Sequence, residues 1–309
     1  MDVFLQQLPQ LLINGLTLGA VYALIALGYS MVYGVLQLLN FAHGDVYMIG
    51  AFIGYFVMVA FLPASGPIIA PVIIIILMML LAMLGCGVLG VVIEQFAYKP
   101  LRNAPRIAPL ISALGVSFFI QNAVQLTLTA KFRNYETEKL IAPGLGFDLG
   151  NARLSLTRAL VIVTAIVLMI VLQYLIRRTR LGKAMRAVAI DREAAAMMGV
   201  NVDQVIIFTF FIGSALAGAA GVLTGIVFTR IYHFMGFSAG LKGFTAAVLG
   251  GIGNIPGAML GGFILGLTET FAVVFISSTY KDVVAFVVLI IVLLLRPRGL
   301  LGARIAQKV

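Results

Sequence analysis

Charged residues are scarce in this chain of 309 residues, where Asp, Glu, Lys and Arg together make up only 10%. Hydrophobic residues make up 62%, and the mean hydropathy is +1.12. A soluble domain is about a quarter charged, because its folded surface must present polar groups to water. The composition therefore excludes a water-soluble enzyme.

Cysteine and histidine are nearly absent, which removes several kinds of site. The single cysteine, Cys86, lies in an apolar run, so neither a disulfide framework nor a cysteine-based metal site is available. Two histidines, His43 and His233, are too few for a zinc or haem cluster. We expect no metal and no cofactor. The net charge of +10 does not indicate nucleic-acid binding, because the sequence has no basic face with interleaved aromatic residues.

Long apolar runs fill most of the chain. One α-helical span needs about 20 apolar residues, so this length allows roughly eight to ten membrane-embedded helices. The runs are too long for the roughly ten-residue alternating strands of a membrane barrel. We predict an all-α polytopic membrane protein with a single transmembrane domain over residues 1–309. The N-terminus lacks the basic region of a signal peptide, so we expect the first apolar run to stay in the mature protein.

The distribution of basic residues predicts the topology. No Lys or Arg occurs in residues 1–93, and the mixed segment 130–157 carries acidic residues among its basic ones. By the positive-inside rule, segments 94–106 and 177–205 and the C-terminus are cytoplasmic, whereas segment 130–157 is periplasmic. An even number of crossings must then lie between residues 205 and 296. The middle apolar block, about 243–275, must therefore cross twice or re-enter.

The basic residues behind this topology fall into three groups. They are Lys99, Arg102 and Arg106 in the first loop; Arg177, Arg178, Arg180, Lys183, Arg186 and Arg192 in the third; and Arg296, Arg298, Arg304 and Lys308 in the tail.

Two apolar segments are interrupted, one in each half of the chain. The first, 35–50, contains several polar residues, and the second, 246–266, is rich in glycine and contains Pro256. Broken backbone at membrane depth must be buried in protein or line a cavity. Paired interrupted segments are typical of a transport pathway between pseudo-symmetric halves. The predicted pathway residues are Asn40, His43, Asp45, Gly250, Gly251, Gly253 and Asn254.

Simpler interpretations exist for both breaks. The first could be an interfacial turn whose polar groups reach headgroup water, and the second could be tight helix packing by small residues. Outside the breaks, we expect Glu269 to make an inward-facing polar contact and Asp282 to form an interfacial pair with Lys281.

The cytoplasmic segment 177–205 contains the pattern of a short capped helix. Asp191 is a good N-cap, Glu193 suits the positive helix N-terminus, and Gly199 supplies a stop after strong helix formers. Asn201 and Gln204 resemble a capping pair for the following span. We expect this helix to present small alanine side chains at its surface, which suits docking into a groove of another protein. The alternative is an ordinary solvated helix.

The same segment resembles a known family. The residues Glu193-Ala194-Ala195-x-x-x-Gly199 match the EAA-x-x-x-G core of the coupling loop in permease subunits of ABC importers, without its second Ile-x-Leu-Pro part. Four longer blocks, 15–52, 181–201, 244–266 and 280–302, resemble the branched-chain amino acid permease family. Within that family the chain is similar to the smaller of two permease subunits, nearly end to end.

This resemblance implies a multi-pass subunit of the bacterial inner membrane. It further implies a second permease subunit, two cytoplasmic ATPase subunits and a periplasmic substrate-binding protein as partners. The chain has no Walker A pattern, so any ATP must be hydrolysed elsewhere. Residues expected to couple to the ATPase are Arg186, Asp191, Glu193, Ala194, Ala195 and Gly199. Arg186 and Arg192 could instead bind anionic lipid.

The sequence thus predicts a non-catalytic subunit of an ATP-driven importer that moves branched-chain or similar hydrophobic amino acids by alternating access. Urea, short amides or other amino acids are alternative substrates. A stand-alone channel or secondary transporter would need buried charge pairs or a titratable relay, for which only Asp45 and Glu269 are candidates. An intramembrane enzyme would need a nucleophile beside His43 and Asp45, which the local sequence lacks.

Overall fold

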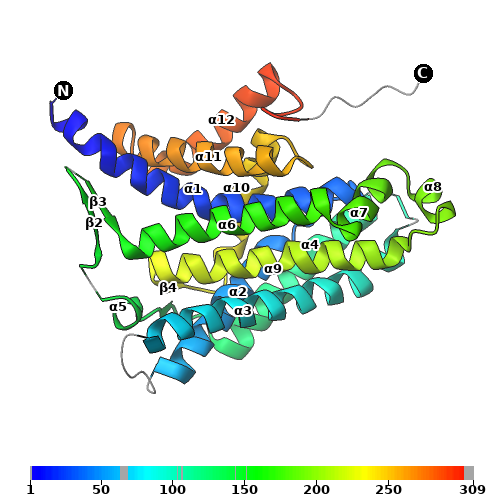
Figure 1. Ribbon diagram of the computed structural model, residues 1–309, viewed down its shortest axis with the longest axis horizontal. Helices are drawn as coiled ribbons and strands as arrows, with labels where there is room; N and C mark the ends of the chain where they lie inside the picture. Colours follow the sequence, from blue (N-terminus) through cyan, green and yellow to red (C-terminus); the bar gives the residue numbers. More distant parts are fainter. Residues whose placement is uncertain are drawn as a thin grey trace.

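The computed structural model describes residues 2–62, 69–102, 104–105, 107–142, 144–150 and 152–302, and long helices dominate it (Figure 1). The helices are α1 (Asp2–Leu36), α2 (His43–Phe61), α3 (Ile69–Ile93), α4 (Ile107–Leu128), α5 (Thr137–Leu140), α6 (Leu156–Arg178), α7 (Arg180–Ile190), α8 (Arg192–Met197), α9 (Val202–Phe228), α10 (Met235–Gly250), α11 (Ile255–Phe275) and α12 (Lys281–Leu295). Of the basic residues used to predict the topology, Arg106, Arg304 and Lys308 lie outside the described residues.

Eight helical segments of the described chain are long and apolar enough to cross a membrane. They comprise α1, α2, α3 with its helical extension to Leu101, α4, α6, α9, α11 and α12. This confirms the predicted all-α polytopic class. The remaining long helix of the bundle, α10, has 16 residues and is about 24 Å long, which is shorter than a hydrocarbon core of about 30 Å.

The middle apolar block is split into two helices, α10 and α11. They pack against each other in antiparallel directions, because Gly250 lies beside Gly257 and Ala246 lies beside Gly261. The turn between them falls in the glycine-rich stretch. The charge distribution requires this block to cross the membrane twice or to re-enter, and a pair of antiparallel helices is compatible with either arrangement.

The bundle has two distinct ends. Figure 1 shows the start of α1, the short helix α5 and the β2–β3 hairpin at one end, and α7 and α8 at the other. The hairpin pairs β2 (Gly146–Leu149) with β3 (Ala152–Ser155), and β1 (Arg133–Asn134) pairs antiparallel with β4 (Arg230–Ile231). Segments 130–157 and 177–205 thus lie at opposite ends, in agreement with the opposite membrane sides that their charges indicate.

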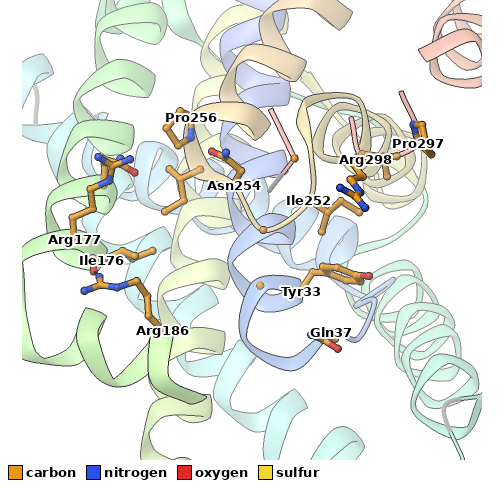
Figure 2. Close-up of a pocket in the computed structure, with 16 residues that line it drawn as sticks. Tyr33, Gln37, Ile176, Arg177, Arg186, Ile252, Asn254, Pro256, Pro297 and Arg298 are labelled. Atoms are coloured by element: carbon orange, nitrogen blue, oxygen red, sulfur yellow. Dashed lines mark hydrogen bonds between the residues drawn. The ribbon is translucent and has the colours of Figure 1, made fainter. Parts of the chain in front are cut away.

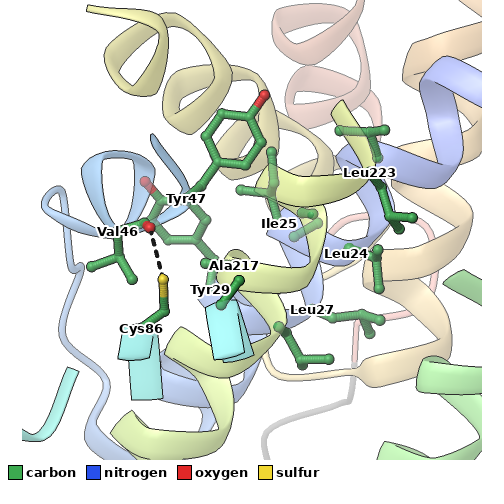
Figure 3. Close-up of a cluster of buried hydrophobic side chains, with 14 of the residues drawn as sticks. Leu24, Ile25, Leu27, Tyr29, Val46, Tyr47, Cys86, Ala217 and Leu223 are labelled. Carbon is green, nitrogen blue, oxygen red and sulfur yellow. Dashed lines mark hydrogen bonds between the residues drawn. The ribbon is translucent and has the colours of Figure 1, made fainter. Parts of the chain in front are cut away.

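Helices α1 and α9 form the centre of the bundle, while α6 and α12 lie at its edge. In the most apolar window of each helix, 72% of α1 and 78% of α9 is buried, against 17% of α6 and 6% of α12. Small residues permit close packing; for example, a Cβ on Gly50 would lie 2.5 Å from the Cα of Gly218. Figure 3 shows the core around α1, α2 and α9, where the Cys86 thiol donates to the Val46 carbonyl at 3.3 Å.

Candidate functional site

The segment between α6 and α9, which the charge distribution predicts to be cytoplasmic, folds into two helices rather than one. Thr179 caps α7 by accepting a hydrogen bond from the Gly182 amide at 3.0 Å. Helix α7 buries Gly182, Met185 and Val188, which share one face. The sequence analysis treated this stretch as a basic loop and missed α7, although the three-residue spacing of these buried positions is a helical signal.

Helix α8 has the caps that the sequence predicts. Asp191 Oδ1 accepts from the amides of Glu193 and Ala194 at 3.0 and 3.1 Å. At the other end, the Gly199 amide donates to the Ala196 carbonyl and the Val200 amide donates to the Ala195 carbonyl, both at 3.0 Å. This is a Schellman motif, which needs a left-handed residue. Gly199 supplies it with φ +80°.

The exposure of α8 differs from the expectation in one respect. Ala194 is exposed, but Ala195 is only 5% exposed and packs into the protein's own core. The sequence analysis placed both alanines at the surface, which is wrong for Ala195, because adjacent positions on a helix point in different directions. The exposed apolar residues at this tip are instead Ile190, Met197 and Met198, at 84–85% exposure.

Arginines attach the segment to the bundle. Arg192 Nη2 donates to the Leu36 carbonyl at the end of α1 at 2.7 Å. Arg186 donates to the Ile176 carbonyl near the end of α6. The first turn of α9 is also held, since Asp203 pairs with Arg102, which in turn pairs with buried Glu94. Both arginines that could have been free for lipid or ATPase therefore already hydrogen-bond to backbone carbonyls.

The polar break at 40–45 lies inside the bundle. Asn40, His43 and Asp45 are 1–2% exposed, which excludes an interfacial turn open to headgroup water. A Cβ on Gly28 would lie 2.4 Å from His43 Nε2, so α2 starts beside a residue eight positions, or about 12 Å, before the end of α1. Helix α2 thus begins within the membrane-spanning part of the bundle.

The carboxylate of Asp45 is satisfied by two side chains of α4. Ser117 Oγ donates at 2.5 Å and Gln121 Nε2 at 3.0 Å. Asn40 Oδ1 accepts from the Tyr98 hydroxyl at 3.2 Å, and the ring of His43 packs edge-on against Tyr29 at 4.6 Å between centroids. The sequence analysis missed these α4 partners; their four-residue spacing, which places both side chains on one face of the helix, is the signal that could have found them.

The second break is an ordered turn. Gly251 and Gly253 have φ of +107° and +87°, and Asn254 Oδ1 caps α11 by accepting from the Gly257 amide at 3.1 Å. The Asn254 side chain also donates to the Leu301 carbonyl at 2.6 Å, and the Leu301 amide donates to the Gly250 carbonyl. The turn is therefore joined to the segment that follows α12.

A buried charge cluster, missed by the sequence analysis, joins four helices. Lys242 of α10 pairs with Glu269 of α11 at 3.0 Å and with Asp282 of α12 at 2.7 Å. The Tyr22 hydroxyl of α1 donates to Glu269 at 2.9 Å. Glu269 does make the expected inward-facing contact. Asp282, however, pairs with Lys242 rather than with Lys281, because α12 packs against α10 at this point.

A cavity of about 670 Å³ lies at the end of the bundle that carries α7 and α8. Its walls come from the end of α1, the end of α6, the turn between α10 and α11, and the segment after α12. Figure 2 shows Asn254, Ile252 and Tyr33 around its centre and arginine side chains at its sides. Of the predicted pathway residues, Gly253 and Asn254 line this cavity, whereas Asn40, His43 and Asp45 do not. The structure thus separates the two breaks into a buried polar cluster and a cavity wall.

Within the described residues, no group of three His, Cys, Asp or Glu side chains is placed to hold a metal ion.

The chain is similar over nearly its whole length to several transport proteins. It is 42% identical over 310 residues to the high-affinity branched-chain amino acid transport system permease protein LivH of Escherichia coli, covering 99% of this chain and 98% of the relative. It is 45% identical over 305 residues to the corresponding protein BraD of Pseudomonas aeruginosa, covering 97% of each.

A solved structure supports the fold. PsaBC from Streptococcus pneumoniae, in complex with Fab, superposes with a TM-score of 0.50 at 12% identity and 96% coverage of both chains. Residues 11–293 match the family described as branched-chain amino acid transport system / permease component. With this match and these identities, the chain belongs to the branched-chain amino acid transport permease family.

Proposed function

We propose that the chain is the transmembrane subunit of an ATP-driven importer that carries branched-chain or similar hydrophobic amino acids across the bacterial inner membrane. The observation that carries this proposal is the end-to-end similarity to permease proteins of high-affinity branched-chain amino acid transport systems. The eight apolar spans supply the membrane-embedded body that such a subunit needs. The chain is a non-catalytic, multi-pass membrane protein.

Hydrolysis of ATP belongs, in this proposal, to two separate cytoplasmic ATPase subunits. A periplasmic binding protein delivers the amino acid, and a second permease subunit completes the pathway. The lack of a Walker A pattern in the sequence supports the assignment of ATP hydrolysis to other chains. Closure of the ATPases would rock the rigid spans between outward-open and inward-open states.

We assign the contact with the ATPase to the tip of α8. Met197 and Met198 are almost fully exposed, as is Ile190 just before Asp191. Methionine side chains are flexible and suit an apolar groove on a partner. Ala194, beside them, is small enough to allow close approach. Glu193, at the start of α8, is exposed and free to meet a basic residue on the ATPase.

The contacts that hold α8 and the start of α9 against the bundle would transmit the movement of the ATPases to the membrane-spanning helices. Arg192 ties α8 to the end of α1, and the Asp203–Arg102–Glu94 contacts tie α9 to the helical extension of α3. Because α1 and α9 are the most buried spans, a displacement of α8 reaches the centre of the bundle directly. Gly199 lets the chain turn between α8 and α9 without strain.

We further propose that the two breaks flank the translocation pathway. The buried Asn40–Asp45 cluster and the turn from Gly250 to Asn254 would be points where helices bend as the bundle rocks. In this proposal, the hydrogen bonds now formed at the two breaks would rearrange during that movement.

The test uses proteoliposomes with the chain, its partner permease and the ATPases. Radiolabelled leucine, isoleucine and valine should accumulate only with ATP and binding protein, and unlabelled urea or short amides should not compete. Accumulation by the permease alone would instead indicate a channel or secondary transporter.

The α8 assignment is tested in the same assay. We expect the double variant Met197→Glu/Met198→Glu to insert normally, since both side chains are exposed, but to lose ATPase co-purification and at least about tenfold in uptake, the equivalent of 1.4 kcal/mol. The control Gln204→Glu places a carboxylate at an exposed position of the first turn of α9 and should behave as wild type. Full ATPase association by the double variant would refute the assignment of the contact to α8. The substrate is tested separately, by the uptake that the wild-type protein supports.

A further inference from the structure

Three arginines from separate elements face the cavity at the α7–α8 end. Arg177 lies in the last turn of α6, Arg186 lies in α7, and Arg298 follows α12. Figure 2 shows Arg177 and Arg186 on one side of the cavity and Arg298 on the opposite side. Among the described residues, no acidic side chain lines the cavity, and none of the three arginines forms an ion pair with an acidic side chain. The three like charges repel one another, so an anion between them would be stabilising.

The cavity is also amphipathic. Ile176, Ile252 and Ile255 contribute apolar surface, and the amides of Gln37 and Asn254 contribute hydrogen-bonding groups. Its volume of about 670 Å³ lies within the usual range for small-molecule sites, roughly 300–1,000 Å³. The ligand that fits is an anion with hydroxyl groups and an adjoining apolar part.

The transported amino acid does not match this lining. A zwitterion presents an ammonium group as well as a carboxylate, and an ammonium group among three guanidinium groups would be repelled. Among the described residues that line the cavity, no carboxylate is present to offset this repulsion by pairing with the ammonium group.

The position of the cavity points to the membrane as the source of the anion. Arg177 lies in the last turn of α6, and this helix is the second least buried of the candidate spans, so most of its surface is left uncovered by the rest of this chain and is accessible to membrane lipid. The basic segment 177–205 places this end on the cytoplasmic side, where anionic lipids attract basic residues.

We propose that this cavity binds the phosphate-bearing headgroup of an anionic phospholipid from the cytoplasmic leaflet. The phosphate sits between the guanidinium groups of Arg177 and Arg298, the headgroup hydroxyls meet Gln37 and Asn254, and the acyl chains leave along α6. Arg186, which is held in place by its hydrogen bond to the Ile176 carbonyl, adds a third positive charge to the wall of the cavity.

Such a lipid would link parts of the fold that are otherwise separate. One wall belongs to α6 and α7, which lead into the coupling tip, and the other belongs to the Gly250–Asn254 turn and the segment after α12. Neutralising the repulsion between these walls would hold the base of the coupling segment against the turn. The lipid would thus favour one position of α7 and α8.

The test measures lipid retained by the purified full-length chain. Protein is delipidated in detergent, exchanged into mixed phosphatidylglycerol and phosphatidylcholine, repurified, and its bound lipid counted by native mass spectrometry. Wild type should retain phosphatidylglycerol selectively. Arg177→Gln/Arg298→Gln should lower this retention by roughly tenfold to thirtyfold, since each basic residue contributes about fivefold near an anionic surface.

The matched control is Arg178→Gln/Arg296→Gln, which removes the same charge from neighbouring positions that do not line the cavity. It should retain phosphatidylglycerol as wild type does. Arg298→Gln alone, at an exposed position after α12, gives a partial loss even if the double variant is unstable.

Three results would overturn the proposal. Equal losses in the lining and control variants would mean general surface attraction. Unchanged retention in the lining variants would mean that the cavity does not hold the lipid. Displacement of the lipid by inorganic phosphate or by leucine at millimolar concentration would assign the cavity to a free anion or to the substrate.

Discussion

At the scale of single residues, Gly44 sets the distance between α2 and α10. A Cβ at this position would lie 2.3 Å from the Gly236 carbonyl oxygen and 2.8 Å from the Gly240 Cα, so no side chain fits. This contact is backbone against backbone, and rotamer changes cannot relieve it. It brings α10 directly onto the start of α2, beside Asp45.

Gly44→Ala should therefore destabilise the protein by roughly 1–3 kcal/mol, the usual cost of overpacking. The matched control is Gly115→Ala in α4, where a Cβ meets nothing within 4 Å and alanine favours the helix. The thermal midpoint of each variant in detergent, compared with wild type, gives the result. Equal midpoints for the two variants would mean that the close approach is not needed.

Sequence alone distinguishes some of these residues and not others. Asn40, His43 and Asp45 were identified because polar side chains stand out in an apolar run. Gly44 and Gly115 look alike in sequence, and their difference depends on whether a helix nearly 200 residues away passes within contact distance. Likewise, the EAA pattern locates α8, but which alanine faces inward depends on the angle at which α8 meets the bundle.

At the scale of elements, the cluster around Lys242 joins α10, α11 and α12 by ion pairs and α1 by the hydrogen bond from Tyr22 to Glu269. Lys242 is 8% exposed at its side chain and Glu269 is 2% exposed, so removing the lysine would leave a carboxylate buried without its cation. An unpaired buried charge is costly, whereas removing both partners together costs much less.

We expect Lys242→Met to lower stability by roughly 3 kcal/mol, and Lys242→Met/Glu269→Gln to recover part of that loss. Lys281→Met removes a neighbouring lysine that does not pair with Asp282 and should change little. A double-mutant cycle on detergent-solubilised protein measures the coupling. Strictly additive losses would show that the pair does not interact energetically.

The elements themselves were predicted unevenly. Long apolar spans follow directly from composition, and the split of the middle block followed from charge bias plus glycine. Helix α7 was missed because the segment was interpreted from its basic residues alone, and the helical spacing of the buried positions Met185 and Val188 was overlooked. The partner of Asp282 was misassigned because Lys281 is adjacent in sequence, while Lys242 is brought near only by the packing of α10 against α12.

At the scale of the whole molecule, nine helices of the described chain lie in the bundle, namely the eight candidate spans and α10. Successive bundle helices alternate in direction, so an odd number places the start of α1 and the end of α12 at opposite ends. The basic segments 94–102 and 177–205 share one end, and segment 130–157 lies at the other (Figure 1). The positive-inside rule predicts that the first end is cytoplasmic.

This orientation can be tested with two variants that each add one cysteine. The native Cys86 is 0% exposed, so we expect it not to react with the labelling reagent. Asn134→Cys lies at an exposed position of the segment 130–157, and Met197→Cys lies at the end of α8, where the residue is 85% exposed. In intact spheroplasts, an impermeant maleimide should label Asn134→Cys. It should label Met197→Cys only after the membrane is permeabilised. The reverse pattern would place α8 outside the cell, out of reach of any cytoplasmic ATPase, and would contradict both the topology and the coupling role derived from it.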